Sequence, residues 1–209
     1  DNLKSNILAV SSYFKIDEKN VTITNLPPEY TYGLSIINTH IYSGAKIILN
    51  NFSVMQKEFW QIINKYNVES FGGVPFTYSL LKKIKFQNLI KNTKLKYLTQ
   101  AGGKLSEDMH RYLVKILLKN KIKFYVMYGA AEATARMSIL SSNTIGSVGK
   151  PLKGYNMSLI NKNKIINKPN NLGEIVFSGK NIFVGYSTNY KDLSKCVIRE
   201  KLFTGDIGK

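Results

Sequence analysis

Short runs of β-branched and aromatic residues alternate with segments of helical period along the first two thirds of the chain. The runs are typical of buried strands, and the segments between them repeat their apolar residues every three or four positions. Strands that alternate with helices in this way predict βαβ units, and therefore a three-layer α/β fold with a parallel sheet flanked by helices. The expected strands span residues 21–24, 45–49, 68–71, 95–99 and 122–127.

Two of the helical segments contain a residue that fits the first position of a helix. Ser53 is placed to cap a helix over residues 53–66, whose apolar positions predict one face packed on the sheet. Ser106 is placed to cap a second helix. Glu107 and Asp108 follow it in the first turn, where the helix dipole favours acidic side chains.

The pattern changes after about residue 145, where short apolar runs are separated by Gly, Pro and Asn and no helical repeat is present. This texture is typical of antiparallel strands. We therefore expect an α/β subdomain over residues 1–143, with a boundary near Asn143, and a small β-rich, barrel-like subdomain over residues 144–209.

The composition shows that the chain is strongly basic. The chain has 209 residues, 44% of them hydrophobic, and a formal net charge of +17. The lysines occur in ones and twos along the whole chain, which favours a solvated surface over a nucleic-acid-binding stripe, although a basic nucleic-acid-binding module remains a less favoured alternative. No apolar run approaches the roughly 20 residues of a membrane span. The lone Cys196 has no partner for an internal disulfide, so we expect a cytoplasmic protein.

The two histidines offer little chemistry. With a single cysteine they do not make an ordinary structural zinc site. His40 falls in an apolar, helix-like stretch and is expected to be packed in the core or at its boundary. His110 falls early in a surface helix and is expected to be solvated.

Small residues follow three of the predicted strands, in the stretches GGVP (72–75), QAGGKLS (100–106) and YGAAE (128–132). The carboxyl ends of parallel strands lie at one edge of a sheet, which is where ligands bind in such folds. Residues without bulky side chains let a ligand approach the backbone closely. Glu132, a lone carboxylate among them, is therefore expected to face a ligand, a metal or water.

These stretches belong to a series of motifs that resembles the adenylate-forming superfamily, which includes acyl-CoA synthetases, adenylation domains of peptide synthetases and luciferases. The resemblance implies an AMP-forming ligase that activates a small carboxylic acid with ATP and Mg²⁺ and passes the acyl group to CoA or to a carrier-protein thiol. It does not identify the acid. The motifs are LPPEYTYGLS (26–35), GVPFTYSLL (73–81), AGGKL (101–105), MYGAAEAT (127–134), GSVGKP (146–151), GEIVFSGKNIFVGY (173–186) and FTGDIG (203–208).

The resemblance also implies roles for individual residues. Glu132 matches the catalytic glutamate that contributes to Mg²⁺ binding, and Tyr128 matches the aromatic residue that lies against adenine. Asp206 matches the aspartate that accepts hydrogen bonds from the ribose hydroxyls, and Tyr30 matches the residue that gates the acyl pocket. The remaining nucleotide-binding positions that it implies are Gly102, Gly103, Gly129 and Ala131.

Two departures from the family pattern leave alternatives open. The residue before the glutamate is usually Thr or Ser but is Ala131 here, and the usual phosphate loop and C-terminal lid are absent, so no lysine is assigned a catalytic role. The chain, which begins at Asp1 and ends at Lys209, is therefore expected to be a piece of a longer enzyme that is inactive by itself, or a non-catalytic remnant of the fold. Glu132 could alternatively form a surface ion pair with Arg136, four residues later.

Overall fold

The larger of two sheets contains all five of the strands expected in the first part of the chain. The computed structural model describes residues 1–140, 144–162, 164–166, 168–195 and 197–209. The sheet has the order β2-β1-β3-β4-β5-β6-β7, and its first five strands are parallel, as predicted. Two short antiparallel strands extend it. Its strands are β1 (Val21–Ile23), β2 (Lys46–Ile48), β3 (Ser70–Gly73), β4 (Tyr97–Gln100), β5 (Lys123–Tyr128), β6 (Ser138–Leu140) and β7 (Lys150–Pro151).

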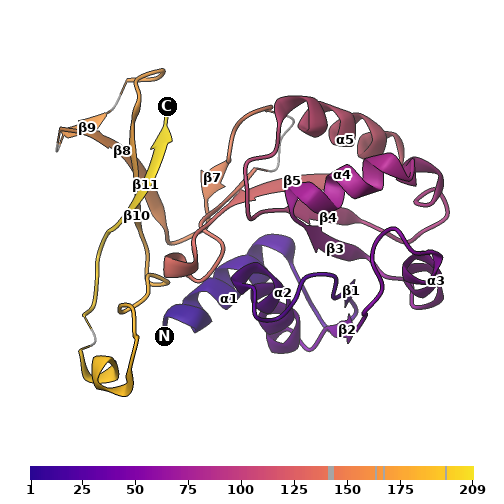
Figure 1. Cartoon of the computed structure of the whole chain (residues 1–209), viewed down its shortest axis with the longest axis horizontal. Coiled ribbons are helices and arrows are strands. Elements are labelled where there is room, and N and C mark those ends of the chain that lie inside the picture. Colours follow the sequence, from indigo (N-terminus) through magenta and orange to yellow (C-terminus); the bar gives the residue numbers. More distant parts are fainter. Residues whose placement is uncertain (141–143, 163, 167, 196) are drawn as a thin grey trace.

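Helices cover both faces of this sheet, which confirms the expected three-layer arrangement (Figure 1). Two helices, α1 and α2, lie on one face, and α4 and α5 lie on the other (Figure 1). The helices are α1 (Asn2–Phe14), α2 (Thr31–Tyr42), α3 (Lys57–Lys65), α4 (Pro75–Lys83) and α5 (Glu107–Lys119). Three short 3₁₀ turns are η1 (Phe86–Asn88), η2 (Ala131–Ala133) and η3 (Tyr190–Ser194).

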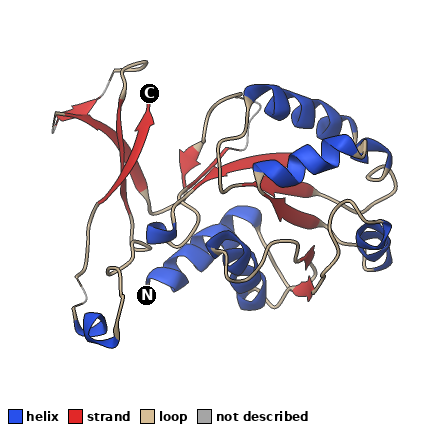
Figure 2. Cartoon of the chain, viewed as in Figure 1, coloured by secondary structure: helices blue, strands red, loops and turns tan. Residues whose placement is uncertain are grey.

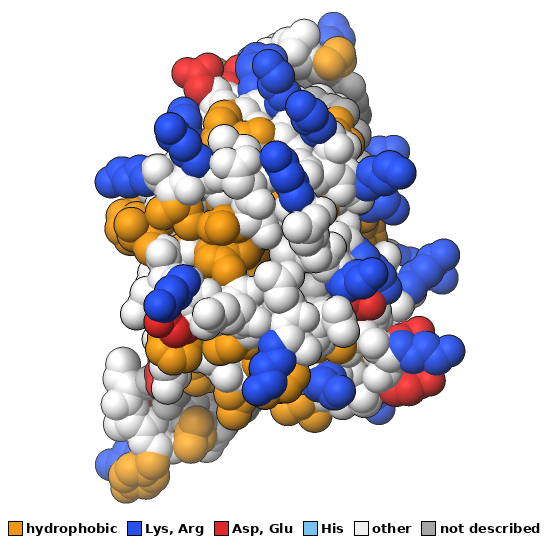
Figure 3. Space-filling view, turned by 90° about the vertical axis from the view of Figure 1, so that its right-hand side faces the viewer, with side chains coloured by type: hydrophobic (Ala, Val, Ile, Leu, Met, Phe, Trp, Pro, Cys, Tyr) orange, Lys and Arg blue, Asp and Glu red, His pale blue; other side chains and the backbone are white. Residues whose placement is uncertain are grey.

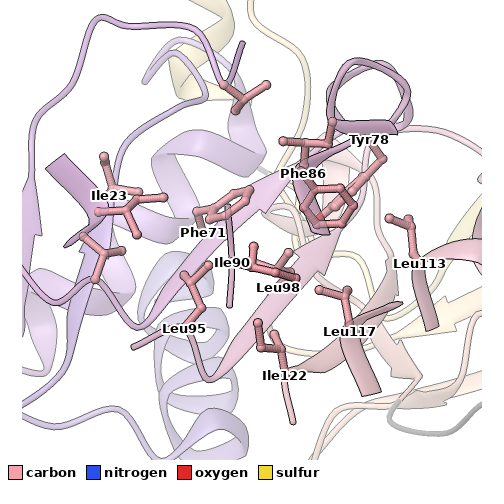
Figure 4. Close-up of a cluster of buried hydrophobic side chains, with 14 of the residues drawn as sticks. Ile23, Phe71, Tyr78, Phe86, Ile90, Leu95, Leu98, Leu113, Leu117 and Ile122 are labelled. Carbon is pink, nitrogen blue, oxygen red and sulfur yellow. The ribbon is translucent and has the colours of Figure 1, made fainter. Parts of the chain in front are cut away.

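The main core fills the space between the sheet and helices α3, α4 and α5 (Figure 4). Successive side chains of a strand point to opposite faces, so Phe71 of β3 and Leu98 of β4 enter this core, whereas their neighbours face α1 and α2. Tyr78 of α4 is fully buried and donates a hydrogen bond of 2.7 Å to the carbonyl oxygen of Thr99. This bond ties α4 to the carboxyl end of β4.

The predicted helix starts have different outcomes. Ser106 caps α5, because its hydroxyl accepts a hydrogen bond of 3.3 Å from the backbone N–H of Met109. Ser53 does not cap α3, which begins only at Lys57; the backbone of Ser53 instead forms a turn with Gln56.

The histidines also differ in outcome. His40 is buried, as expected. The prediction for His110 was wrong: it is only 3% exposed and packs edge-on against Phe124 of β5, because it lies on the side of α5 that covers the sheet.

The β-rich part forms a separate antiparallel sheet of four strands, with the order β11-β10-β8-β9 (Figure 2). Its strands are β8 (Asn156–Asn161), β9 (Lys164–Ile166), β10 (Gly173–Ser178) and β11 (Leu202–Gly208). The predicted boundary at Asn143 lies outside the described residues. Because β7 still belongs to the first sheet, the chain passes from one sheet to the other between Pro151 and Asn156.

Lysine and arginine side chains are spread over the face shown in Figure 3 and do not gather in one stripe. This arrangement agrees with the dispersed pattern of lysines in the sequence. None of the described helices combines the length and apolar character that a membrane crossing requires.

Candidate functional site

The two sheets meet at a hydrogen bond between Tyr128 and Asp206. Tyr128 is the last residue of β5, and its hydroxyl donates to Asp206 Oδ2 over 2.5 Å. Burial is the largest of the effects that raise the pKa of Tyr128 to about 12, and the neighbouring carboxylate adds to it. The tyrosine is therefore neutral near pH 7 and stays a hydrogen-bond donor. Two residues that sequence analysis assigned to one site are thus in direct contact.

Asp206 is brought to this position by an irregularity in β11. The pairing of β10 with β11 shifts between Glu174 and Val176, and Gly205 has a φ of 74°, which a glycine adopts without strain. The hydroxyl of Thr204 donates to the carbonyl oxygen of Ile175 over 2.8 Å and fixes the bulge. A regular strand would not project the carboxylate in this way.

Glu132 lies in η2, shortly after β5, and is partly exposed. Its Oε1 atom accepts a hydrogen bond of 2.6 Å from the hydroxyl of Tyr186, which is the largest of the effects that lower the pKa of the Glu132 carboxyl. The backbone carbonyl of Glu132 also accepts from the N–H of Phe183 over 2.7 Å. Glu132 is thus an ionised carboxylate held between the end of β5 and the segment after β10.

The alternative ion pair between Glu132 and Arg136 is not formed. Arg136 is only 3% exposed, and its guanidinium lies 5.5 Å from the centre of the Tyr32 ring. Thr134 and Ala135 have φ values of 51° and 88°, so the chain reverses after η2 and does not continue as a helix that would bring residues four apart together.

Gly129 is required by this reversal. A Cβ added at Gly129 would overlap the carbonyl oxygen of Ala135, so any other residue would push the loop away from β5. Ala131 begins η2, and its carbonyl oxygen accepts a hydrogen bond of 3.0 Å from the N–H of Thr134. The small residues of this stretch allow the tight fold of the loop and also leave Glu132 uncovered.

Two residues that support the loop were not assigned from the sequence. Asn181 is fully buried and donates to the carbonyl oxygen of Ala133 over 2.6 Å. Tyr186 binds the Glu132 carboxylate, as described above. Both belong to the stretch GEIVFSGKNIFVGY, so the motif was noted, but which of its side chains reach η2 depends on how the second sheet packs against the first.

The third group of predicted residues lies at the ends of β3 and β4. Gly102 and Gly103 have φ values of 74° and 155°, and the carbonyl oxygen of Gly103 accepts a hydrogen bond of 2.9 Å from the side chain of Gln100. Tyr30 lies against Gly102, where an added Cβ would overlap its hydroxyl oxygen. The structure therefore joins Tyr30 to Gly102, and Tyr128 to Asp206, at the carboxyl ends of adjacent parallel strands.

A groove of about 650 Å³ lies beside these strand ends and was not predicted. It is lined by the loops that follow β1 and β2 together with Thr77 and Leu80 of α4, and it does not include Tyr128, Glu132 or Asp206. The motifs LPPEYTYGLS (26–35) and GVPFTYSLL (73–81) contribute Leu26, Pro27, Pro28, Thr77 and Leu80 to its lining, but the groove also depends on the loop after β2, which carries no motif.

The carboxylates of this site suit a cation that is bound jointly by the protein and by phosphates. They do not suit a metal ion held by protein side chains alone. The described residues contain no group of three or more His, Cys, Asp or Glu side chains that would hold a metal ion. Mg²⁺ in nucleotide enzymes is commonly held by one or two carboxylates plus the phosphates. Glu132 is ionised, partly exposed and without a Lys or Arg partner among the described residues, so it fits such a role.

Comparison with known proteins places the chain in a family. A family model described as "AMP-binding enzyme" matches residues 1–187. An oxalate–CoA ligase of Arabidopsis thaliana is 28% identical over 221 residues, which cover 99% of this chain but 41% of that enzyme. The chain thus spans less than half of that relative's length.

Solved structures show the same fold. The N-terminal domain of FACL13 from Mycobacterium tuberculosis matches with a TM-score of 0.83 at 17% identity, covering 100% of this chain and 53% of that one. The o-succinylbenzoate CoA synthetase MenE of Bacillus subtilis, in complex with its acyl-adenylate intermediate OSB-AMP, matches with a TM-score of 0.82 at 20% identity, covering 99% and 42%.

Proposed function

Because the chain belongs to the family of AMP-binding enzymes, we propose that it carries the nucleotide site of an AMP-forming acid–thiol ligase. In the proposed reaction a substrate carboxylate attacks the α-phosphate of ATP, pyrophosphate leaves, and the acyl group of the adenylate passes to a thiol. The observation that carries the proposal is the meeting of Tyr128 and Asp206 across two sheets, beside the partly exposed carboxylate of Glu132.

The nucleotide would lie along the ends of β4 and β5. The half-buried ring of Tyr128 offers a flat apolar face for adenine, and the carboxylate of Asp206 has acceptor capacity left for ribose hydroxyls after its bond to Tyr128. Gly102 and Gly103 have no side chains, so Tyr30 can pack on the backbone at Gly102 and the base can approach the backbone at Gly103. Gly129 and Ala131 keep the loop above β5 compact for the same reason.

Glu132 would hold Mg²⁺ together with the phosphates of ATP. When bound, the cation offsets the negative charge that the phosphates concentrate at the site. The hydrogen bond from Tyr186 keeps the Glu132 carboxylate ionised and turned toward the segment after β10.

The acid would enter beside Tyr30, which stands against Gly102 and is 36% exposed, so its ring is placed to close over an acyl group. The thiol is that of CoA or of a carrier protein. The two relatives named above act, by name, on oxalate and o-succinylbenzoate, which are different acids. Their names therefore assign neither acid to this chain.

One observation favours a second candidate, a non-catalytic remnant that binds nucleotide. Ala131 has no hydroxyl for the α-phosphate, and a lost hydrogen bond to a charged group is worth roughly 1.5–3 kcal/mol. The nearby Thr134 does not replace it, because its hydroxyl donates to the carbonyl oxygen of Asn181 over 3.4 Å.

Acid-dependent exchange of radiolabelled pyrophosphate into ATP separates the two candidates. The complete gene product is expected to catalyse exchange with at least one acid of a broad panel. The 209-residue chain alone is expected to catalyse none, because the phosphate loop and lid that the family uses are not in it. A complete product that binds ATP but gives no exchange with any acid would favour the remnant.

A further inference from the structure

The segment that joins β10 to β11 exposes a series of large apolar side chains to solvent. It spans residues 179–201, of which 179–195 and 197–201 are described, and it extends away from both sheets with η3 at its far end (Figure 1). Exposed apolar side chains that gather in one place mark a surface for interaction. Those of this segment are Val184 (42% exposed), Tyr186 (74%), Tyr190 (78%), Leu193 (67%), Val197 (57%) and Ile198 (89%).

Polar hydrogen bonds fix the tip of the β10–β11 segment. Asp192 Oδ2 accepts from the backbone N–H groups of Thr188 and Asn189 over 3.0 and 3.3 Å, and from the hydroxyl of Thr188 over 3.0 Å. None of the residues of η3 is buried. Residues three apart lie on the same side of a 3₁₀ helix, so η3 presents Tyr190 and Leu193 together. The tip is therefore a preformed turn with two apolar side chains on one side.

The two arms of the segment lie side by side behind this tip. The N–H of Val197 donates to the carbonyl oxygen of Val184 over 3.2 Å, which brings the apolar residues of both arms close together. At its base the outgoing arm is bonded to η2, because the hydroxyl of Tyr186 donates to the carboxylate of Glu132 over 2.6 Å. The base of the segment is thus held against the first sheet, while its tip stands in solvent.

The same segment carries an excess of positive charge. Residues 180–201 include five basic and two acidic residues. One of the two acids, Asp192, has a side chain that is only 20% exposed, because it is used in the turn at the tip. The basic residues are all exposed, and they are Lys180, Lys191, Lys195, Arg199 and Lys201. Positive charge therefore lies next to the exposed apolar side chains along the whole segment.

This combination fits the surface of an anionic membrane better than another protein or a nucleic acid. Lysine is depleted in protein–protein interfaces, whereas anionic lipid headgroups attract lysines close to the bilayer. Tyrosine is enriched at the boundary between headgroups and hydrocarbon, and aliphatic side chains enter the acyl region below it. A nucleic acid would neutralise the lysines but would leave Ile198, which is 89% exposed, without an apolar environment.

We propose that the β10–β11 segment docks the protein reversibly on an anionic lipid bilayer. Tyr190, Leu193, Val197 and Ile198 enter the boundary between headgroups and acyl chains, and the basic residues of the segment contact the headgroups. Both contributions are needed, because a few apolar side chains alone give only weak membrane binding. The inference goes beyond the proposed function and does not depend on it, since none of these four residues belongs to the nucleotide site.

Co-sedimentation of the 209-residue chain with lipid vesicles tests the docking. Vesicles of phosphatidylglycerol and phosphatidylcholine in equal parts are compared with vesicles of phosphatidylcholine alone, and the chain is expected to bind the anionic vesicles. The double variant Val197→Ser with Ile198→Ser keeps every charge but should weaken this binding about fivefold or more, because apolar contact is lost. The matched control, Leu118→Ser with Ile165→Ser, removes side chains that are 52% and 62% exposed elsewhere and should bind as the parent chain does.

A tryptophan at the tip reports the environment of η3 directly. Tyr190→Trp adds a second tryptophan to Trp60, which is only 5% exposed. Its emission should move to shorter wavelength when anionic vesicles are added and should be quenched by lipids with brominated acyl chains. Tyr66→Trp, at the end of α3 and 42% exposed in the parent chain, should show neither change.

The outcomes distinguish this surface from its alternatives. Equal vesicle binding by the parent chain and by Val197→Ser with Ile198→Ser would assign the binding to the dispersed lysines and overturn the proposal. An unshifted emission of Tyr190→Trp on bound vesicles, or no binding to anionic vesicles at all, would also overturn it. A dimer in analytical ultracentrifugation that the double variant abolishes would instead make the segment a protein interface. If circular dichroism shows that the double variant is unfolded, the emission of Tyr190→Trp decides.

Discussion

The hydroxyl of Tyr128 and the carboxylate of Asp206 are 78 positions apart in the sequence, yet they share a hydrogen bond of 2.5 Å. The sequence predicted both residues for one site but not their contact, because that contact depends on a bulge in β11. His110 shows the opposite case: its side chain was expected in solvent and is buried, because α5 packs on the sheet through the face that carries it.

At the residue scale, buried His40 predicts a loss of stability in acid. Burial lowers the pKa of His40 to about 4 from its ordinary 6.5. Between pH 6.5 and 4 His40 is protonated in the unfolded chain but stays neutral in the folded chain. The free energy of unfolding therefore falls as the pH falls from 6.5 to 4. The loss is about 3 kcal/mol at pH 4. Urea unfolding across this range checks it: His40→Gln should show a flatter profile, and a profile equal to that of the parent chain would contradict the burial argument.

Glu132 gives a second prediction at this scale. Glu132→Gln keeps the shape of the side chain but removes its charge, so the complete gene product should need a higher Mg²⁺ concentration for half-maximal pyrophosphate exchange and should exchange more slowly. Glu107→Gln, in the first turn of α5, is the matched control. An unaltered Mg²⁺ dependence in Glu132→Gln would remove this residue from the metal site.

At the scale of elements, the sequence predicted the five parallel strands and the start of α5, because those features follow from periodicity and capping. It did not predict that β6 and β7 extend the first sheet in the antiparallel sense, since each is too short to show a pattern. It also missed that α3 begins only at Lys57, because Ser53 forms a turn before the helix.

The prediction at this scale concerns the loop between β5 and β6 and its effect on AMP binding. In Gly129→Ala the new Cβ collides with the carbonyl of Ala135, so the loop must move, at a cost of about 1–3 kcal/mol, and Glu132 and Tyr128 lose their relative positions. Differential scanning calorimetry and AMP binding should both detect this change. Gly154→Ala is the control for AMP binding: its φ of 87° makes the substitution strained, but its Cβ would meet nothing within 4 Å, so it is expected to lower stability and to leave AMP binding unchanged. If Gly129→Ala binds AMP with the affinity of the parent chain, the conformation of this loop does not determine AMP binding.

At the scale of the whole molecule, the net charge of +17 leaves two alternatives, a solvated surface and a nucleic-acid-binding surface. The lysines are dispersed over the face in Figure 3, so we expect labelled duplex DNA to bind with a Kd no tighter than about 10 μM near physiological salt. Fluorescence anisotropy over a salt series checks this expectation. Submicromolar binding with a steep dependence on salt would instead support the nucleic-acid-binding alternative.

The central claim is that two sheets combine to form a nucleotide site at Tyr128, Glu132 and Asp206, and the most direct measurement is the affinity of the 209-residue chain for AMP by isothermal titration calorimetry. We predict that the chain binds AMP and that Asp206→Asn weakens binding about tenfold or more, because a charged acceptor for the ribose hydroxyls is lost, whereas the control Asp108→Asn in α5 does not. A chain that does not bind AMP, or an Asp206→Asn variant with unchanged affinity, would contradict the site.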